Sequence, residues 1–225
     1  ETLVSDLVKS IKTAANDDRI NSLVLELDHM SGGGISKLEE IGEALEQFRK
    51  SDKPIIAVGN NFSQQQYYLA SFADEIYLNP MGSVMLTGLG SYPVYMKDAL
   101  DKLNINVNVF RVGQFKDAIE PFTRNDMSDQ SRLHTKEMLE TLWNAYTRRV
   151  ESMRKLPVGA IDDYIGNLPE KLAVHQGNAA QLALQSGLVD HIATHEDVLK
   201  KLQQIAGSDD SDSYLSIDHS RYRQI

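Results

Sequence analysis

Apolar residues recur along this chain with two periods, and the alternation between the periods predicts alternating helices and strands. Apolar positions spaced three and four residues apart predict amphipathic helices, and short runs rich in Val, Ile and Leu predict buried strands. The elements expected in the first part are a helix over 3–11, a strand at 23–27, a helix from 36 to 48, a strand at 54–58, a helix over 63–72 and a strand at 75–78. This order is typical of an α/β fold with parallel strands.

The second part continues the pattern with longer helices. The expected elements are a helix over 96–103, a strand at 107–112, a long helix from 128 that ends before Pro157, a helix over 178–185, a short strand that starts at 188–190 and a helix over 196–205. Local signals mark several helix ends. Ser36 and Glu39 form a capping-box pattern, Ser128 is placed to cap the long helix, and Gly187 fits the position just after a helix.

The length and the composition favour one sizeable domain. We expect a single folded domain over 1–206 and a polar linker over 207–225, which is rich in Ser and Asp. The chain opens at Glu1 without a methionine, so we expect it to be a part of a longer protein, in which any upstream targeting or anchoring segment lies outside this chain and the polar linker leads into a missing segment.

Charge and composition exclude several classes of function. The net charge of −9 and the pI near 5.1 argue against nucleic acid binding and against docking on anionic lipid. No run is long and apolar enough to span a bilayer, and the absence of cysteine excludes thiol chemistry. His191 and His195 lack the intervening glutamate of a helical zinc motif, and Gly32–Gly34 lack the Gly-Lys-Ser/Thr ending of a phosphate loop, so we expect no cofactor.

Lys116 is the candidate catalytic residue. It follows the apolar run at 107–112, with Gly113 three residues before it, and a neutral amine held at a strand exit can act as a general base. The pKa of its amine would have to fall by about 3 units, which costs about 4 kcal/mol and requires desolvation. We therefore expect Lys116 near a domain or subunit boundary, with the carboxylates of Asp117 and Glu120 turned away from it.

The surrounding residues resemble the lysine motif of the signal peptide peptidase A (protease IV) family, whose members are membrane-anchored serine proteases with a Ser/Lys dyad. The matching positions of this motif are Gly113, Phe115, Lys116, Ala118, Pro121 and Phe122. Further matches are Asn79-Pro80, Thr87-Gly88, the helix at 67–74 and Gly187-Leu188-Val189-Asp190. The resemblance implies the crotonase/Clp-protease fold, which is a spiral of β-β-α units, and a chain that corresponds to the lysine-bearing amino-terminal half of a tandem.

One departure from the family pattern affects the function. The family's nucleophilic serine falls on Gln64, and the two glycines that follow it are replaced by Gln65 and Gln66. Ser63 lies one residue out of register, about 100° around a helix, and is better interpreted as a helix N-cap. The glycine-rich stretch at 28–34 is either an anion-binding nest or a tight turn between a strand and a helix.

These observations predict a half-site of a Ser/Lys-dyad endopeptidase. Lys116 would activate a serine of another segment, and the resemblance implies that the substrates are cleaved signal peptides and other unfolded peptides on the periplasmic side of the inner membrane. The resemblance also implies a homo-oligomer, a tetramer. The broad apolar face of residues 128–155 predicts contacts with another subunit or with the missing half, and the equal alternative is that this helix packs wholly within its own domain. Two alternatives remain open: a non-catalytic or acyl-thioester-binding domain in which Gly32–Gly34 hold an oxyanion, and a purely structural assembly module.

Overall fold

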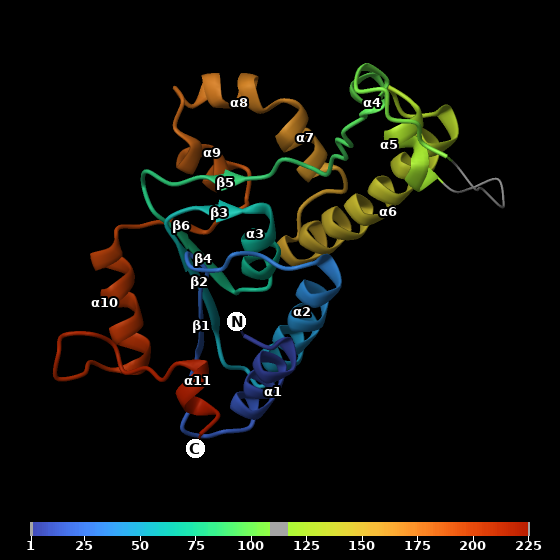
Figure 1. Cartoon of the computed structure of the whole chain (residues 1–225). Helices are drawn as coiled ribbons and strands as arrows, with labels where there is room; N and C mark the ends of the chain where they lie inside the picture. Colours follow the sequence, from blue (N-terminus) through green and yellow to red (C-terminus); the bar gives the residue numbers. More distant parts are fainter. Residues whose placement is uncertain (1, 109–116, 225) are drawn as a thin grey trace. The chain divides into compact units, whose positions relative to one another are not determined.

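The chain folds into two compact units. The computed structural model describes residues 2–108 and 117–224 (Figure 1). Unit 1 comprises residues 1–87 and 146–225, and unit 2 comprises residues 88–145.

Unit 1 is built on a four-stranded parallel sheet in the order β1-β2-β4-β6, with a second parallel pair, β3-β5. The strands are β1 (Leu23–Glu26), β2 (Ile55–Gly59), β3 (Phe62–Ser63), β4 (Glu75–Leu78), β5 (Val84–Met85) and β6 (His191–Ile192). The helices are α1 (Val4–Ala15), α2 (Ile35–Arg49), α3 (Gln64–Ala70), α7 (Ala160–Gly166), α8 (Leu168–Val174), α9 (Ala179–Gln185), α10 (His195–Ala206), α11 (His219–Tyr222) and the last turns of α6 (Asp129–Arg154).

The order of the strands in space is that of a spiral. The chain runs through β2, β3 and α3 and then through β4 and β5, so two strands in sequence occupy two different sheets. In the next β-β-α repeat, β4 pairs in parallel with β2, and β5 pairs in parallel with β3. Each β-β-α repeat therefore lies beside the previous repeat, with its strands running in the same direction. The predicted α/β class, with its crotonase-like spiral of β-β-α units, is confirmed.

Helices cover both faces of the four-stranded sheet (Figure 1). On one face, Leu202 of α10 packs against Ile56 and Tyr77. On the other side lie α1 and α2, and the α2 side chains Leu45 and Phe48 are fully buried. Because successive residues of a strand point to opposite faces, a strand covered on both sides must be apolar throughout, as Ile55, Ile56 and Ala57 of β2 are.

Most predicted helix ends are confirmed, and one is wrong. Ser128 caps α6 through its Oγ, which accepts a hydrogen bond from the Ser131 amide (3.1 Å), and Gly187 has the left-handed φ of +70° expected after a helix. The capping box at Ser36 does not form. Gly34 is already the N-cap, with φ −63° and ψ 150°, and α2 begins at Ile35, so Ser36 lies within the first turn.

The short strand predicted to start at 188–190 is present but begins later, because β6 consists of His191–Ile192. The amide of Leu188 is still engaged with the end of α9, since it donates to the Ala183 carbonyl (2.9 Å). Bonding to the sheet starts at Asp190, whose amide donates to the Ile76 carbonyl (3.0 Å). The strand therefore cannot begin at Leu188, because that residue still belongs to the C-terminal cap of α9.

Unit 2 contains α4 (Lys97–Lys102), the short helix η1 (Asp117–Ile119), α5 (Glu120–Thr123) and the first turns of α6. The Met96 amide donates to the Pro121 carbonyl (2.7 Å), and Asp98 and Asn125 exchange two hydrogen bonds, so α4 is tied to the segment around α5. Of the predicted strand at 107–112, Val107 and Asn108 are described and lie in no strand, and the other residues lie outside the described part.

The described residues of the predicted linker at 207–225 belong to unit 1 and bond to its other parts. The hydroxyl of Tyr214 donates to a carboxylate oxygen of Glu26 (2.6 Å), and the hydroxyl of Tyr222 in α11 donates to a carboxylate oxygen of Asp17 (2.8 Å). That this segment leads to a second half remains a prediction.

Candidate active site

The candidate site lies where the parallel strands of unit 1 end. In open α/β sheets ligands bind beyond the carboxyl ends of the strands. The carboxylate of Asp28, which follows β1, accepts hydrogen bonds from Asn60, which follows β2. The donors are the backbone amide of Asn60 (2.8 Å) and its side-chain amide (2.6 Å). The side chain of Asn79, after β4, donates to the side-chain oxygen of Asn60 (3.2 Å). This network joins the ends of three strands and fixes the loops around the start of α3.

Ser63 is the N-cap of α3, as the sequence predicts. Its Oγ accepts from the amide of Gln66 (3.4 Å), and the Oε1 of Gln66 accepts from the Ser63 amide (2.8 Å), which completes a capping box. The hydroxyl oxygen therefore serves the helix start.

Gln64 occupies the first position of α3, where the family pattern has its serine. Its side-chain oxygen accepts a hydrogen bond from the Thr87 amide (3.0 Å). An amide side chain cannot attack a carbonyl, so this position supplies no nucleophile.

The glycine-rich turn after β1 is held by the next two glutamines. The Oε1 of Gln65 accepts from the Gly33 amide (3.2 Å). The buried Gln66 donates from its Nε2 to the carbonyls of Leu27 (2.7 Å) and Met30 (3.2 Å). Sequence reasoning treated these glutamines only as a loss of family residues and missed their contacts. The spacing Ser-x-x-Gln from 63 to 66 is a capping-box signal that could have placed Gln66.

Two aromatic side chains of α3, Tyr67 and Tyr68, fix this helix in the core. The hydroxyl of the buried Tyr67 donates to the Leu188 carbonyl (2.6 Å), and burial raises the pKa of Tyr67 well above its ordinary value. The ring of Tyr68 packs against Phe72 (5.7 Å between centroids) and Tyr146 (5.5 Å). The start of α3 therefore rests on a well-packed core.

Lys116, the predicted catalytic residue, lies outside the described residues. The residues that follow it begin with η1 and α5. Glu120 is buried, and its carboxylate accepts from the Ser128 amide (3.1 Å) at the start of α6. This carboxylate is thus engaged in helix capping. The predicted desolvation of Lys116, and the predicted orientation of Asp117 and Glu120 away from it, remain predictions.

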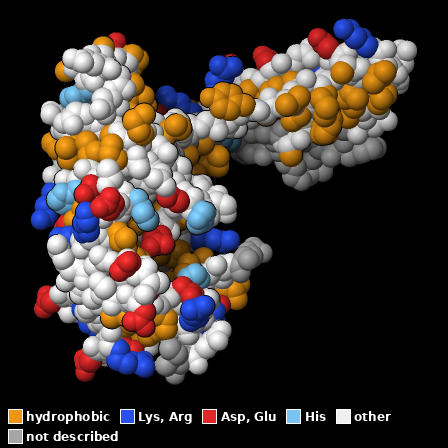
Figure 2. Space-filling model, turned by 90° about the vertical axis from the view of Figure 1, so that its left-hand side faces the viewer, with side chains coloured by type: hydrophobic (Ala, Val, Ile, Leu, Met, Phe, Trp, Pro, Cys, Tyr) orange, Lys and Arg blue, Asp and Glu red, His pale blue; other side chains and the backbone are white. Residues whose placement is uncertain are grey.

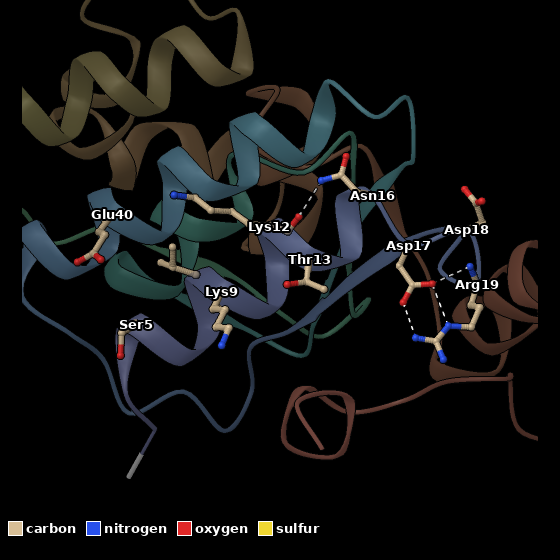
Figure 3. Close-up of a pocket in the computed structure, with 10 residues that line it drawn as sticks. Ser5, Lys9, Lys12, Thr13, Asn16, Asp17, Asp18, Arg19 and Glu40 are labelled. Atoms are coloured by element: carbon tan, nitrogen blue, oxygen red, sulfur yellow. Dashed lines mark hydrogen bonds and ion pairs between the residues drawn. The ribbon is translucent and has the colours of Figure 1, made fainter. Parts of the chain in front are cut away.

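Two surface hollows lie elsewhere. One follows α1 and the turn after it, where Arg19 pairs with Asp17 (2.8 Å) and its hydrogen bonds hold the pKa of Asp17 below its ordinary value (Figure 3). Figure 3 shows Ser5, Lys9 and Lys12 along the same helix, and the bonds drawn there are those between Arg19 and Asp17 and the one from the Asn16 side chain to the Lys12 carbonyl. The other hollow, in unit 2, is lined by residues that include Leu89, Leu139 and Trp143.

The histidines and acidic residues of the described ranges do not gather into a metal site. No group of three or more potential ligands is found within 2–108 and 117–224. The Nε2 of His191 lies 3.2 Å from a carboxylate oxygen of Glu75, and its ring stacks on Tyr77 (4.5 Å). In the same ranges no helix has the length and hydropathy needed to cross a membrane.

Comparison with known proteins decides the family. Residues 47–209, more than half of the chain, match peptidase family S49. The chain belongs to peptidase family S49. It is 40% identical to the protein named Protease 4 of Haemophilus influenzae over 95% of this chain and 35% of the relative. It is 38% identical to Protease 4 of Salmonella typhi over 99% of this chain and 36% of the relative.

A more distant relative is the chloroplastic serine protease SPPA of Arabidopsis thaliana, at 25% identity over 97% of this chain and 31% of that protein. The predicted signal peptide peptidase A (protease IV) family is thereby confirmed. The chain spans about a third of the length of these relatives.

Proposed function

We propose that this chain is the lysine-bearing half of a Ser/Lys-dyad serine endopeptidase. In the proposal, the neutral amine of Lys116 removes the proton from a serine hydroxyl on a segment outside residues 1–225. The serine oxygen then attacks the substrate carbonyl, and the protonated amine returns the proton to the leaving amine. The substrates are unfolded peptides, such as cleaved signal peptides, on the periplasmic side of the inner membrane, where an upstream segment anchors the protein.

The main support for this proposal is the absence of a serine nucleophile at the start of α3. A family S49 peptidase requires a nucleophile, yet the serine position holds Gln64, and the neighbouring Ser63 is engaged in a capping box with Gln66. If the whole protein is a peptidase, its nucleophile must therefore come from elsewhere.

The rival function, acyl-thioester binding at Gly32–Gly34, has less support. An oxyanion would need free amide donors in this turn, and the Gly33 amide already donates to the side chain of Gln65.

Association with further copies is part of the proposal. Unit 2 exposes many large hydrophobic side chains, which Figure 2 shows gathered on its surface. Among the described residues of unit 2 these are Leu89, Tyr92, Val94, Met96, Leu103, Ile105, Val107, Phe122, Leu133 and Met138. Hydrophobic side chains gathered on a surface favour contacts with another copy or with the second half.

Covalent labelling of the full-length protein tests the proposal. A fluorophosphonate that reacts with activated serines, followed by mass-spectrometric mapping, is expected to modify a serine outside residues 1–225. Lys116→Ala is expected to abolish the labelling, because the base is lost. A label on Ser63, or on any serine within 1–225, would overturn the proposal.

A further inference from the structure

Two backbone amides at the candidate site donate to the side chains of neighbouring glutamines. The Gly33 amide, in the turn after β1, donates to the Oε1 of Gln65 (3.2 Å). The Thr87 amide, after β5, donates to the Oε1 of Gln64 (3.0 Å). Both amides lie outside helices and strands, at the surface of unit 1. Two separate loops thus present N–H groups to the start of one helix.

The oxygen atoms that receive these bonds are carbonyl oxygens of primary amides, chemically close to the carbonyl of a peptide bond. Loop amides of this kind are the donors that peptidases use to bind a substrate carbonyl or its oxyanion. We infer that the side-chain oxygens of Gln64 and Gln65 occupy the positions that the carbonyl oxygens of a bound peptide would take, and so prevent peptide binding at this site. The inference does not depend on the role proposed for Lys116.

The glycine at position 32 provides independent geometric support. A Cβ added to Gly32 would lie 1.9 Å from the Oε1 of Gln65, so the glutamine oxygen fills the space directly against the turn. Gly32 also has a φ of +111°, which side chains rarely adopt. At Gly34, by contrast, an added Cβ would meet nothing within 4 Å. The Gln65 side chain therefore covers the turn at Gly32, whereas the space beside Gly34 is unoccupied.

The turn does not rely on Gln65 for its position. Gln66 binds the carbonyls of Leu27 and Met30 from below, and Asp28 is held by two hydrogen bonds from Asn60. Gln65 itself is exposed. Loss of its side chain should therefore leave the turn in place and its Gly33 amide open.

Amide hydrogen exchange in the full-length protein tests the inference, read at single residues by mass spectrometry with electron-transfer fragmentation. Gln65→Ala is expected to accelerate exchange at Gly33 by about three- to tenfold, the effect of one lost hydrogen bond, and to leave Thr87 unchanged. Gln64→Ala is expected to do the reverse. Unchanged exchange at Gly33 in Gln65→Ala would overturn the inference.

Two further variants keep the test decisive if Gln65→Ala folds poorly. Gln65→Asn keeps the amide but shortens the side chain, so it should also expose the Gly33 amide. Gly32→Ala should displace the Gln65 oxygen, and also strain the backbone at its φ of +111°, and so accelerate exchange at Gly33, whereas Gly34→Ala, at a φ of −63°, should leave it unchanged. Equal effects of the two glycine variants, or no effect of Gln65→Asn, would contradict the inference.

Discussion

The hydroxyl of Tyr146 in α6 donates a hydrogen bond to the backbone carbonyl of Gln64 at the start of α3 (2.8 Å). Tyr146 is buried, and burial raises the pKa of its hydroxyl well above the ordinary value, so it remains a donor at all physiological pH values. The long helix is thereby bonded to the position where the family pattern has its serine.

Removal of this bond should lower stability without opening a large cavity. Tyr146→Phe is expected to reduce the free energy of unfolding by about 1 kcal/mol, the typical contribution of one hydrogen bond. Denaturant unfolding measures the change. The matched control is Tyr92→Phe, since Tyr92 is 93% exposed and should tolerate the loss of its hydroxyl. Equal stability of Tyr146→Phe and the parent protein would show that the bond contributes nothing.

Gly42 allows α2 to approach the core closely. A Cβ at this position would lie 2.4 Å from the ring of Phe72, which is fully buried. Gly42→Ala is therefore expected to destabilise the protein by about 1–3 kcal/mol through overpacking. The control is Gly166→Ala at the end of α7, where an added Cβ meets nothing within 4 Å and should be neutral or slightly stabilising. Thermal unfolding of both variants measures the contrast, which a tolerated Gly42→Ala would refute.

The interactions of Glu75 with Tyr77 and Lys201 predict a specific pH dependence. The hydrogen bond from Tyr77 is the main cause that holds the pKa of Glu75 below its ordinary value, and Lys201 acts in the same direction. A carboxylate with a lowered pKa in the folded state stabilises the protein above its unfolded pKa, and this stabilisation is lost as the pH falls through the folded pKa.

Tyr77→Phe should therefore cost most at neutral pH, and its effect should shrink below about pH 4, the ordinary range of glutamate. Urea unfolding at several pH values measures the difference. Tyr164→Phe is the matched control. Its hydroxyl donates to the Val84 carbonyl, and burial raises its pKa to about 12, so its effect should not vary in acid. A cost of Tyr77→Phe that is constant from neutral to acid pH would contradict the account.

The sequence predicts the parts of this structure that depend on local signals. The apolar runs at 54–58 and 75–78 fall on β2 and β4, and Ser63 caps α3 because Gln66 stands at the right distance. The contact of Gln65 with Gly33 joins residues 32 positions apart, and local pattern does not encode which side chain reaches which turn. Local signals also failed at Ser36, where the extended Gly34 started the helix earlier.

The exposed hydrophobic side chains of unit 2 lead to a prediction about assembly. Trp143 lines a surface hollow of this unit with Leu89 and Leu139. In the full-length protein, Trp143→Asp is expected to dissociate the proposed assembly and to abolish peptidase activity, because the two residues of the proposed dyad would lie on separate parts. Sedimentation and a peptide-cleavage assay measure both effects.

The control for this substitution is Thr141→Asp, which adds the same charge at an exposed position of α6. It should leave assembly and activity intact. A folded Trp143→Asp variant that is monomeric and fully active would refute both the interface and the shared site.

The central claim, that this chain provides the base and not the nucleophile, is tested most directly by the peptidase activity of full-length Lys116→Ala. The account predicts a fall in kcat by a factor of at least about 100 with little change in KM, as expected for the loss of a general base. Lys102→Ala, at the exposed end of α4, should retain parental activity. Parental kcat in Lys116→Ala would contradict the account.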